Sequence, residues 1–143
     1  MEQVHATTID LNGDGVMLRG PSASGKSDLG LRLIDAGARL VADDRTELTL
    51  SGGAVRASAP KQIAGRMEVR GIGIMEVPTV PETRLALVVE LVGAEDVERL
   101  PEPETADVLG VALPLVRLAP FEASAPAKVR TALKNLSQTK DQL

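Results

Sequence analysis

An eight-residue run near the N-terminus contains the residue types that hold the phosphates of a nucleotide. The run is Gly20, Pro21, Ser22, Ala23, Ser24, Gly25, Lys26 and Ser27, and it matches the pattern G-x-x-x-x-G-K-[ST] in full. Glycines let successive backbone N–H groups curl around phosphate oxygens, and a following helix adds the positive end of its dipole. In such a P-loop, Lys26 reaches the β- and γ-phosphates and the Ser27 hydroxyl ligates magnesium. The run therefore predicts a site for nucleotide phosphates and Mg²⁺.

Two adjacent carboxylates, Asp43 and Asp44, follow a short apolar segment. Neighbouring residues at the end of a strand point to opposite sides. One carboxylate could therefore serve the metal while the other faces a second substrate. The alternative is a solvated acidic turn, or an ion pair with Arg45. Behind a P-loop, the functional interpretation is favoured.

Regular elements flank these residues on both sides. Alternation over residues 4–9, the turn residues 12–15 and the apolar run 16–18 predict a hairpin with a buried second strand. An amphipathic helix follows the P-loop, with Leu29, Leu33 and Ala36 on one face and Ile34 beside them, and Gly37 ends it. Further strands are predicted at residues 39–42, 46–50, 54–58, 85–91 and 113–118, and a C-terminal helix after an N-cap at Ser124, with Val129, Leu133 and Leu136 on its buried face.

The remaining segments have weaker patterns. Residues 63–77 are interrupted by glycines, which predicts a functional loop rather than a regular element. Residues 95–100 favour one or two helical turns, and residues 101–105, acidic and broken by prolines, favour an exposed loop. Strands dominate the first half and helices are few, so a mixed α/β fold is expected.

Composition excludes several classes of protein. The chain has 143 residues, 43% hydrophobic and 25% charged, with a net charge of -4, which fits one domain. The acidic balance and a single aromatic ring, Phe121, argue against nucleic-acid binding. Zero cysteines and one histidine exclude disulfides, thiol catalysis and the common zinc motifs. No apolar run approaches the length of a membrane span, so we expect no membrane contact and a cytoplasmic location.

The P-loop by itself does not decide the reaction. The Asn-Lys-x-Asp segment of a GTPase is missing, since Lys134-Asn135 does not supply it. Arginines that could contact a moving phosphate are scattered: Arg66, Arg70, Arg84, Arg99 and Arg117. These residues leave open a phosphotransferase, an NTPase or a module that senses a nucleotide and transfers nothing.

Four segments together resemble the catalytic domain of bacterial HPr kinase/phosphorylase. They are His5, the P-loop, residues 40–45 (LVADDR) and residues 67–74 (MEVRGIGI), the last being more specific than a P-loop. That family phosphorylates a serine of HPr, the small phosphocarrier of the sugar phosphotransferase system, and can reverse the reaction with inorganic phosphate. The resemblance implies an α/β, P-loop nucleotide-binding fold of the type shared with phosphoenolpyruvate carboxykinase. It also implies a single catalytic domain over residues 1–143, without the family's N-terminal domain.

The resemblance implies a role for each matching residue. Lys26 corresponds to the phosphate-binding lysine, Ser27 and Glu68 to the magnesium ligands, and Asp43 to a support for the metal. Asp44 corresponds to the carboxylate that takes the proton from the target serine.

Two further catalytic residues and the partners come from the same resemblance. Arg99 resembles the active-site arginine, and His5 corresponds to a histidine near the phosphates. The C-terminal helix, with Lys128, Arg130 and Lys134, corresponds to a region that contacts HPr and neighbouring subunits, which implies a homo-oligomer, a hexamer in the family. A solvated basic face is the alternative.

One departure bears on the direction of the reaction. The family has a Pro-Gly-Arg-Asn loop tied to dephosphorylation, whereas residues 115–121 here read LVRLAPF and keep only Arg117. The resemblance implies an ATP- and Mg²⁺-dependent serine kinase acting on HPr or a paralogous phosphocarrier, and this departure predicts weak reverse phosphorolysis. The alternatives are another P-loop small-molecule kinase or NTPase, and a non-catalytic ATP-sensing regulatory module.

Overall fold

The first hairpin is set by its two-residue turn. The structure, a computed structural model, describes residues 1–141, with side chains to residue 136. Asn12 and Gly13 have φ angles of 53° and 95°, and a turn with two positive φ angles matches the twist of the strands that it joins. β1 (Glu2–Leu11) and β2 (Asp14–Arg19) therefore pair antiparallel, with Leu11 opposite Asp14. The predicted hairpin is confirmed.

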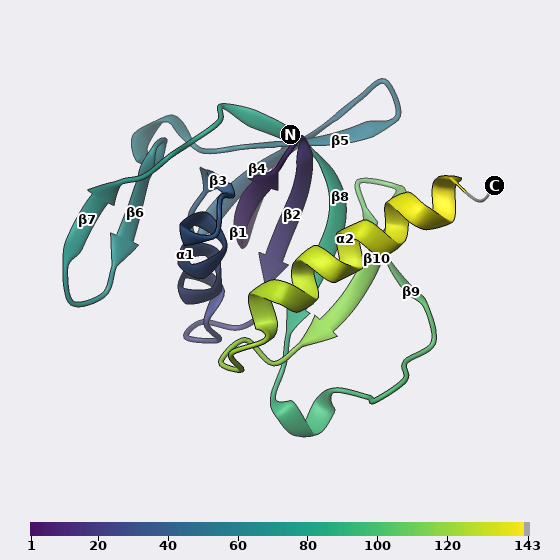
Figure 1. The fold of residues 1–143 in the computed structure, drawn as a ribbon. Coiled ribbons are helices and arrows are strands. Elements are labelled where there is room, and N and C mark those ends of the chain that lie inside the picture. Colours follow the sequence, from purple (N-terminus) through teal and green to yellow (C-terminus); the bar gives the residue numbers. More distant parts are fainter. Residues whose placement is uncertain (142–143) are drawn as a thin grey trace.

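The other elements follow in chain order (Figure 1). They are α1 (Lys26–Asp35), β3 (Arg39–Ala42), β4 (Arg45–Ser51), β5 (Ala54–Ser58), the 3-10 turn η1 (Lys61–Ile63), β6 (Arg66–Val69), β7 (Gly73–Glu76), β8 (Glu82–Leu91), the 3-10 turn η2 (Ala94–Asp96), β9 (Glu104–Val108), β10 (Val111–Leu118) and α2 (Ala125–Asp141).

Five strands form a closed ring of hydrogen-bonded neighbours, in the order β2–β1–β4–β5–β8 and back to β2. The pairing of β2 with β8 is parallel, as is that of β8 with β10, and β9 pairs antiparallel with β10 beyond them. Each strand of the ring contributes to one buried cluster, through Ala6, Met17, Leu48, Val55 and Leu85. This shared cluster stabilises the ring because apolar surface from all five strands leaves water together.

Both helices cover one face of the sheet (Figure 1). Leu29 and Leu33 of α1 and Val129 of α2 share a second buried cluster, the helix-side cluster, with Leu18 of β2 and Val89 of β8. The helix after the P-loop and the C-terminal helix are therefore confirmed, although Ala36 lies exposed past the end of α1. Within the described residues, neither helix combines the length and the apolarity needed to cross a membrane.

The edge of β1 changes partner along its length. Its first part, from Glu2 to His5, pairs with β4, and its later part pairs with β3, with a shift in register between Thr8 and Ile9. Asp43 and Asp44 lie between β3 and β4, so they fill the gap where the two partners of β1 meet. The two adjacent carboxylates are thus held at a break in the sheet.

Residues 63–77 differ from the sequence-based expectation of a functional loop without regular structure. They contain β6 and β7, which pair antiparallel as a separate two-stranded sheet, so that expectation was wrong. Gly71 lies in the turn between β6 and β7, and Gly73 begins β7. Their φ angles of 90° and 131° are ones that glycine adopts readily. Met67 is only 1% exposed and belongs to the helix-side cluster, which ties this hairpin to the rest of the molecule.

Two other boundaries also differ. Helical structure in residues 95–100 is limited to the short turn η2, which ends at Asp96. The exposed loop predicted for residues 101–105 gives way to β9 at Glu104, because Glu104 lies opposite Leu115 and its carboxylate binds Arg117. Pairing with β10 therefore overrides the acidic character of this segment. The predicted strands at 39–42, 46–50, 54–58, 85–91 and 113–118 are confirmed.

The helix-side cluster generates a prediction about stability. Leu33→Ala removes a fully buried side chain, so we expect the free energy of unfolding to fall by about 2–5 kcal/mol. Urea unfolding followed by far-ultraviolet circular dichroism measures the change. Leu50→Ala is the matched control, because Leu50 is 54% exposed and its loss should change stability by about 0.5 kcal/mol or less. Equal losses in both variants would contradict the assignment of the core.

Candidate active site

The P-loop (residues 20–27) wraps around the start of α1. Ala23 and Gly25 have φ angles of 62° and 96°, and Ser24 N–H donates to Pro21 O at 3.1 Å, which closes the turn. Gly25 is the N-cap residue of α1, and no side chain among the described residues caps it. The first N–H groups of the helix thus face the loop, where an anion is stabilised by them and by the helix dipole.

Lys26 begins α1 and turns back over the loop. Its Nζ donates to Gly20 O at 2.9 Å and to Pro21 O at 3.0 Å, and the residue is 8% exposed. The ammonium group therefore sits inside the curve of the loop, held by two carbonyl oxygens. A phosphate oxygen entering the loop would offer it a charged acceptor, which makes a stronger hydrogen bond than a carbonyl does.

Asp43 joins the P-loop to the sheet. Its Oδ1 accepts hydrogen bonds from Ser27 Oγ at 2.6 Å and from Thr7 Oγ1 at 3.1 Å, and its Oδ2 accepts from Glu68 N–H at 3.4 Å. The residue is 8% exposed. Asp43 and Ser27 were both predicted for the metal site, and the structure brings their oxygens into direct contact.

Asp44 points away from this network into solvent. Its φ angle is 66°, and its own N–H donates to Thr7 Oγ1 at 3.2 Å while its carbonyl accepts from Ala6 N–H at 3.0 Å. Asp is among the residue types that adopt this left-handed conformation most readily. The backbone reversal is what turns the two carboxylates in different directions, as the sequence predicted.

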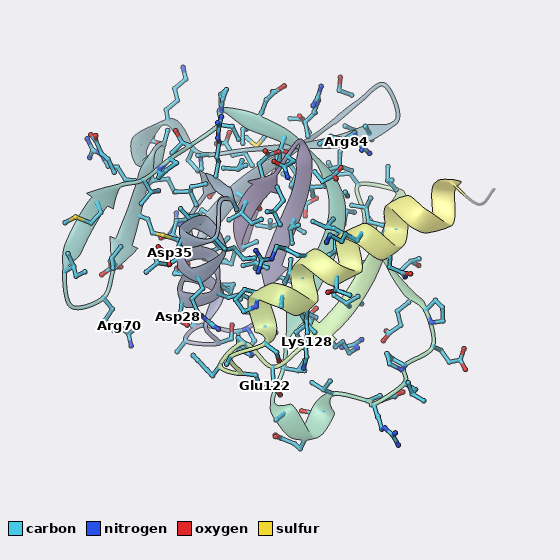
Figure 2. The ribbon with its side chains drawn as sticks, in the orientation of Figure 1. Asp28, Asp35, Arg70, Arg84, Glu122 and Lys128 are labelled. Atoms are coloured by element: carbon cyan, nitrogen blue, oxygen red, sulfur yellow. The ribbon has the colours of Figure 1, made fainter. Side chains whose placement is uncertain are left out.

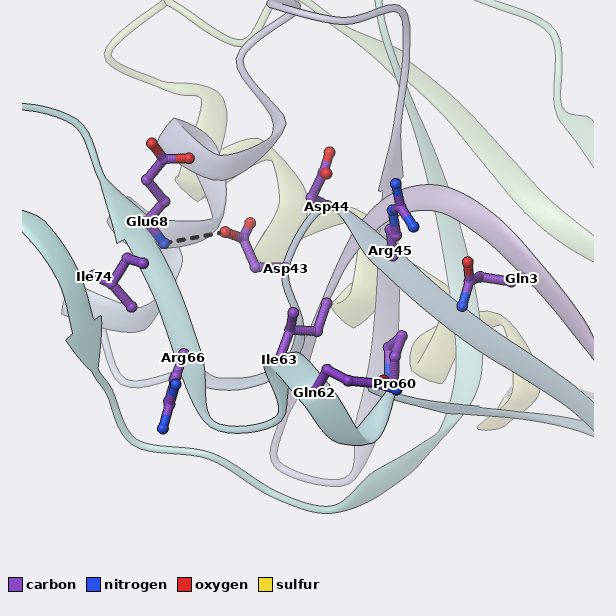
Figure 3. A pocket seen from close by; sticks show the side chains of 10 residues that line it. All are labelled: Gln3, Asp43, Asp44, Arg45, Pro60, Gln62, Ile63, Arg66, Glu68 and Ile74. Carbon is purple, nitrogen blue, oxygen red and sulfur yellow. Dashed lines mark hydrogen bonds between the residues drawn. The ribbon is translucent and has the colours of Figure 1, made fainter.

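Two neighbouring cavities meet at Asp44 and Glu68. The P-loop cavity, of about 410 Å³, is lined by Ser22, Ala23, Ser24, Gly25, Lys26, Ser27, Asp28, Leu31, Asp44, Glu68, Val69, Arg70 and Phe121. The second cavity, of about 590 Å³, is lined by Gln3, Asp43, Asp44, Arg45, Pro60, Gln62, Ile63, Arg66, Glu68 and Ile74 (Figure 3). Asp44 and Glu68 line both. In Figure 3 the carboxylates of these two residues lie on either side of Asp43. A group bound in one cavity and a group bound in the other would therefore come close to each other beside Asp44 and Glu68.

The donor set fits Mg²⁺. Ser27 Oγ and the carboxylate of Asp43 are hard oxygen donors 2.6 Å apart, and Glu68 lines the same P-loop cavity. Within the described residues, no group of three or more histidines, cysteines, aspartates and glutamates is placed to hold a metal by itself. Mg²⁺ suits such a site, because it is bound through one or two protein ligands and completes its shell with water and substrate phosphates.

A sequence model of the HPr Serine kinase C-terminal domain matches residues 1–140. The chain belongs to this family. A solved structure of the Hpr(Ser) kinase/phosphatase from Coxiella burnetii superposes with a TM-score of 0.86 and 27% sequence identity, and the match covers 99% of this chain and 94% of that chain. The expected α/β fold of the HPr kinase type is thereby confirmed.

Curated relatives carry the same family name. HPr kinase/phosphorylase of Acidovorax sp. is 42% identical over 121 residues, and that of Verminephrobacter eiseniae is 41% identical over 121 residues. In both cases the match covers 76% of this chain and 38% of the relative. The chain thus spans well under half the length of these HPr kinase family members.

Two predicted catalytic residues lie outside the lining of both cavities. His5 is exposed on β1, opposite Arg45 and next to the break where the aspartates lie. It is two residues from Gln3, which lines the second cavity, and alternate residues of a strand share a face. Arg99 is exposed between η2 and β9. The roles of His5 and Arg99 in this member of the HPr kinase family stay predictions.

Arg117 is part of the sheet and not of a loop. It lies on β10, and its Nε and Nη2 donate to the two carboxylate oxygens of Glu104 at 3.1 and 3.0 Å. The hydrogen bonds with Arg117 lower the pKa of the Glu104 carboxyl, and those with Glu104 raise the pKa of Arg117. The guanidinium of Arg117 is therefore bound to Glu104 on the neighbouring strand β9.

Sequence reasoning missed Thr7 and the apolar lining of the P-loop cavity. Thr7 is fully buried and contacts both aspartates, through its hydroxyl to Asp43 and from the N–H of Asp44. Its position in a buried strand next to a second threonine was the only available signal, and it does not indicate a partner 36 residues away. Val69 and Phe121 could be placed at the P-loop only through tertiary structure.

The position of Lys26 generates a prediction about nucleotide affinity. Lys26→Ala removes a charge-assisted hydrogen-bond donor from the P-loop, so we expect the Kd for MgATP to rise about 10- to 100-fold. Isothermal titration calorimetry measures it. Lys134→Ala, an exposed change on α2 that leaves the net charge equal to that of Lys26→Ala, is the control and should bind as the wild type does. Unchanged affinity in the Lys26 variant would contradict the phosphate-binding role of the loop.

Proposed function

We propose that this chain is a protein-serine kinase that transfers the γ-phosphoryl group of ATP, with Mg²⁺, to HPr or a paralogous phosphocarrier. The observation that carries the proposal is the position of Asp44, which lines both the P-loop cavity and the second cavity. A kinase needs a group at the junction of donor and acceptor, and a carboxylate is a suitable base there. Membership of the HPr kinase family supports the choice of acceptor.

In the proposed transfer, each of the site residues has a separate role. The P-loop N–H groups and Lys26 hold the β- and γ-phosphates. Asp44 accepts the proton of the acceptor serine while the serine oxygen forms a bond to the γ-phosphorus. At the same time the bond between the γ-phosphorus and the bridging oxygen of the β-phosphate breaks. Ser27, Asp43 and Glu68 would hold Mg²⁺, which neutralises charge that develops on the phosphate oxygens. The hydroxyl of Thr7 accepts a hydrogen bond from the backbone N–H of Asp44 and thereby keeps Asp44 in place.

The second cavity fits a polypeptide acceptor. Its lining combines the apolar Pro60, Ile63 and Ile74 with the cationic Arg45 and Arg66. Its volume of about 590 Å³ lies in the usual range for ligand sites, and several side chains of a surface segment could occupy it. We propose that the segment carrying the acceptor serine enters here.

The position of Arg117 supports a mainly forward reaction. Arg117 is held by Glu104 on β10 and lines neither cavity, so it is not available to a phosphoserine at Asp44. Reversal requires two anionic groups to approach each other, and their repulsion must be offset by several donors. Phosphorolysis is therefore proposed to be weak. A cytoplasmic location and assembly into a hexamer stay predictions of the sequence.

A transfer assay separates this proposal from its alternatives. Incubation with γ-labelled ATP, Mg²⁺ and purified HPr-type carriers should place the label on a serine of the carrier. Label released as inorganic phosphate would indicate an NTPase, and label on a small molecule would indicate another P-loop kinase. ATP binding without any transfer would indicate a sensing module.

The first prediction from the proposal concerns Asp44. Asp44→Asn keeps the size of the side chain and tolerates the positive φ angle, but it removes the proton acceptor. We expect the transfer rate to fall about 10²- to 10⁴-fold while the Kd for MgATP stays close to that of the wild type. Rapid-quench transfer assays and calorimetry measure the two quantities. Asp35→Asn, at the exposed end of α1 (Figure 2), is the control. Near-normal transfer in the Asp44 variant would refute its role as base.

The second prediction concerns Glu68. Glu68 lines both cavities, and its N–H donates to Asp43, so Glu68→Gln should weaken Mg²⁺ binding without moving the β6 backbone. We expect the Mg²⁺ concentration for half-maximal transfer to rise several-fold, about as much as loss of one charged ligand implies. Glu76→Gln, exposed on β7 of the same hairpin, is the matched control. Identical magnesium titrations for the Glu68 variant and the wild type would place Glu68 outside the metal site.

A further inference from the structure

The chain's single phenylalanine lines the P-loop cavity. Phe121 is 71% exposed, although it is the largest apolar residue in the sequence. It lines the P-loop cavity and not the second cavity. A Cβ atom built on Gly25 would lie 3.0 Å from Phe121 Cζ and 3.1 Å from Cε1, so the ring rests directly against the P-loop. Burial in the core does not explain this position.

A short turn presents the ring. Glu122 N–H lies 3.5 Å from Ala119 O, which places Pro120 and Phe121 at the two central positions of the turn between β10 and α2. Proline is favoured at the first central position because its φ angle is already fixed. Ala119 before the turn and Ala125 after it are buried, so both ends of the segment are anchored. The tip carries Phe121 outward.

Arg32 of α1 fixes the turn from the other side. Its guanidinium donates to Glu122 O at 3.2 Å and to Pro120 O, the carbonyls on either side of Phe121, and it also pairs with Asp28 Oδ2 at 2.9 Å. Glu122 in turn binds Lys128 at 3.0 Å. Asp28, Glu122 and Lys128 lie at the same end of the molecule (Figure 2). The backbone on both sides of Phe121 is thus held by α1.

The position of the ring suits a part of the ligand other than its phosphates. The P-loop cavity is also lined by the apolar Leu31 and Val69 and by the charged Asp28, Asp44, Glu68 and Arg70. An exposed phenyl ring beside the P-loop offers a phosphate group no hydrogen bond. A flat, heteroaromatic group attached to the phosphates would cover the ring, and such a group stacks on an aromatic face.

We infer that Phe121 is the platform on which the purine base of the nucleotide stacks, beside the P-loop. This inference rests on the proposed function, in which the P-loop binds ATP, and it adds which part of the chain recognises the base. The base site is built by the β10–α2 turn, whose backbone is bound by Arg32.

The test compares ATP with inorganic tripolyphosphate, which has the phosphates without the base. For Phe121→Ala, we expect the Kd for MgATP to rise about ten-fold, in line with the usual loss of one stacking partner, and the Kd for magnesium tripolyphosphate to stay unchanged. Phe121→Leu, which keeps apolar area without a ring, should lie between the wild type and Phe121→Ala for ATP. Leu50→Ala, an exposed apolar residue outside both cavities, should bind both ligands as the wild type does.

A fluorescent variant gives a direct readout. The chain has no tryptophan and no tyrosine, so Phe121→Trp introduces a single emitter at the proposed base site. Stacking of adenine should quench its emission on addition of MgATP, and magnesium tripolyphosphate at saturation should not.

The outcomes separate this inference from the function on which it rests. An unchanged Kd for ATP in Phe121→Ala would overturn the base site and leave phosphate binding intact. Equal losses for ATP and tripolyphosphate would show that the ring supports the P-loop through Gly25, which also overturns it. If the wild type binds neither ligand, the proposed function fails, and the base site fails with it.

Discussion

The carboxylate of Asp43 accepts hydrogen bonds from three segments that are far apart in the sequence: Thr7 of β1, Ser27 of α1 and the backbone of Glu68 in β6. A buried carboxylate without such donors would carry a large desolvation cost. The network therefore does two things at once. It makes burial of the charge tolerable, and it fixes the P-loop, the sheet and the β6–β7 hairpin relative to one another. Segments that line the cavities at Asp44 and Glu68 are thus joined through this one group.

The break in the pairing of β1 is the geometric counterpart of this network. Because β3 and β4 share one edge of β1, two residues must leave the ladder between them, and those residues are Asp43 and Asp44. A regular strand would place adjacent side chains on opposite faces of a continuous sheet. Here the positive φ angle of Asp44 turns its carboxylate into solvent while Asp43 stays buried. One local distortion thus yields a buried, hydrogen-bonded acid and an exposed acid side by side.

Local patterns in the sequence were sufficient for much of this arrangement. The P-loop, the amphipathic periods of both helices and the turn residues at 12–15 depend on neighbours within a few positions, and these elements agree with the structure. Residues 63–77 did not, because their glycines indicate unusual backbone angles without showing that a hairpin surrounds them. Thr7 and Phe121 were missed for a related reason: each reaches the site through contacts with residues distant in the chain. Arg117 was considered for the site by its place in the sequence, yet the strand pairing gives it to Glu104.

The closed ring of strands has a consequence for how the chain acquires its shape. The parallel pair that closes the ring joins β2, which ends at Arg19, to β8, which begins at Glu82. This pair can form only after β8 has been synthesised. Parallel pairing between such distant segments is slow, because the entropy of closing the intervening loop is lost before the contacts are gained. On a ribosome that adds about 5–20 residues per second, the free edge of β2 stays open for several seconds. The P-loop packs against Leu91 at the far end of β8, so it takes its final form only after that closure. Nascent chains of this protein therefore pass through a stage with an unpaired apolar strand and no formed phosphate site, and that stage is where chaperones and competing strands have access to them.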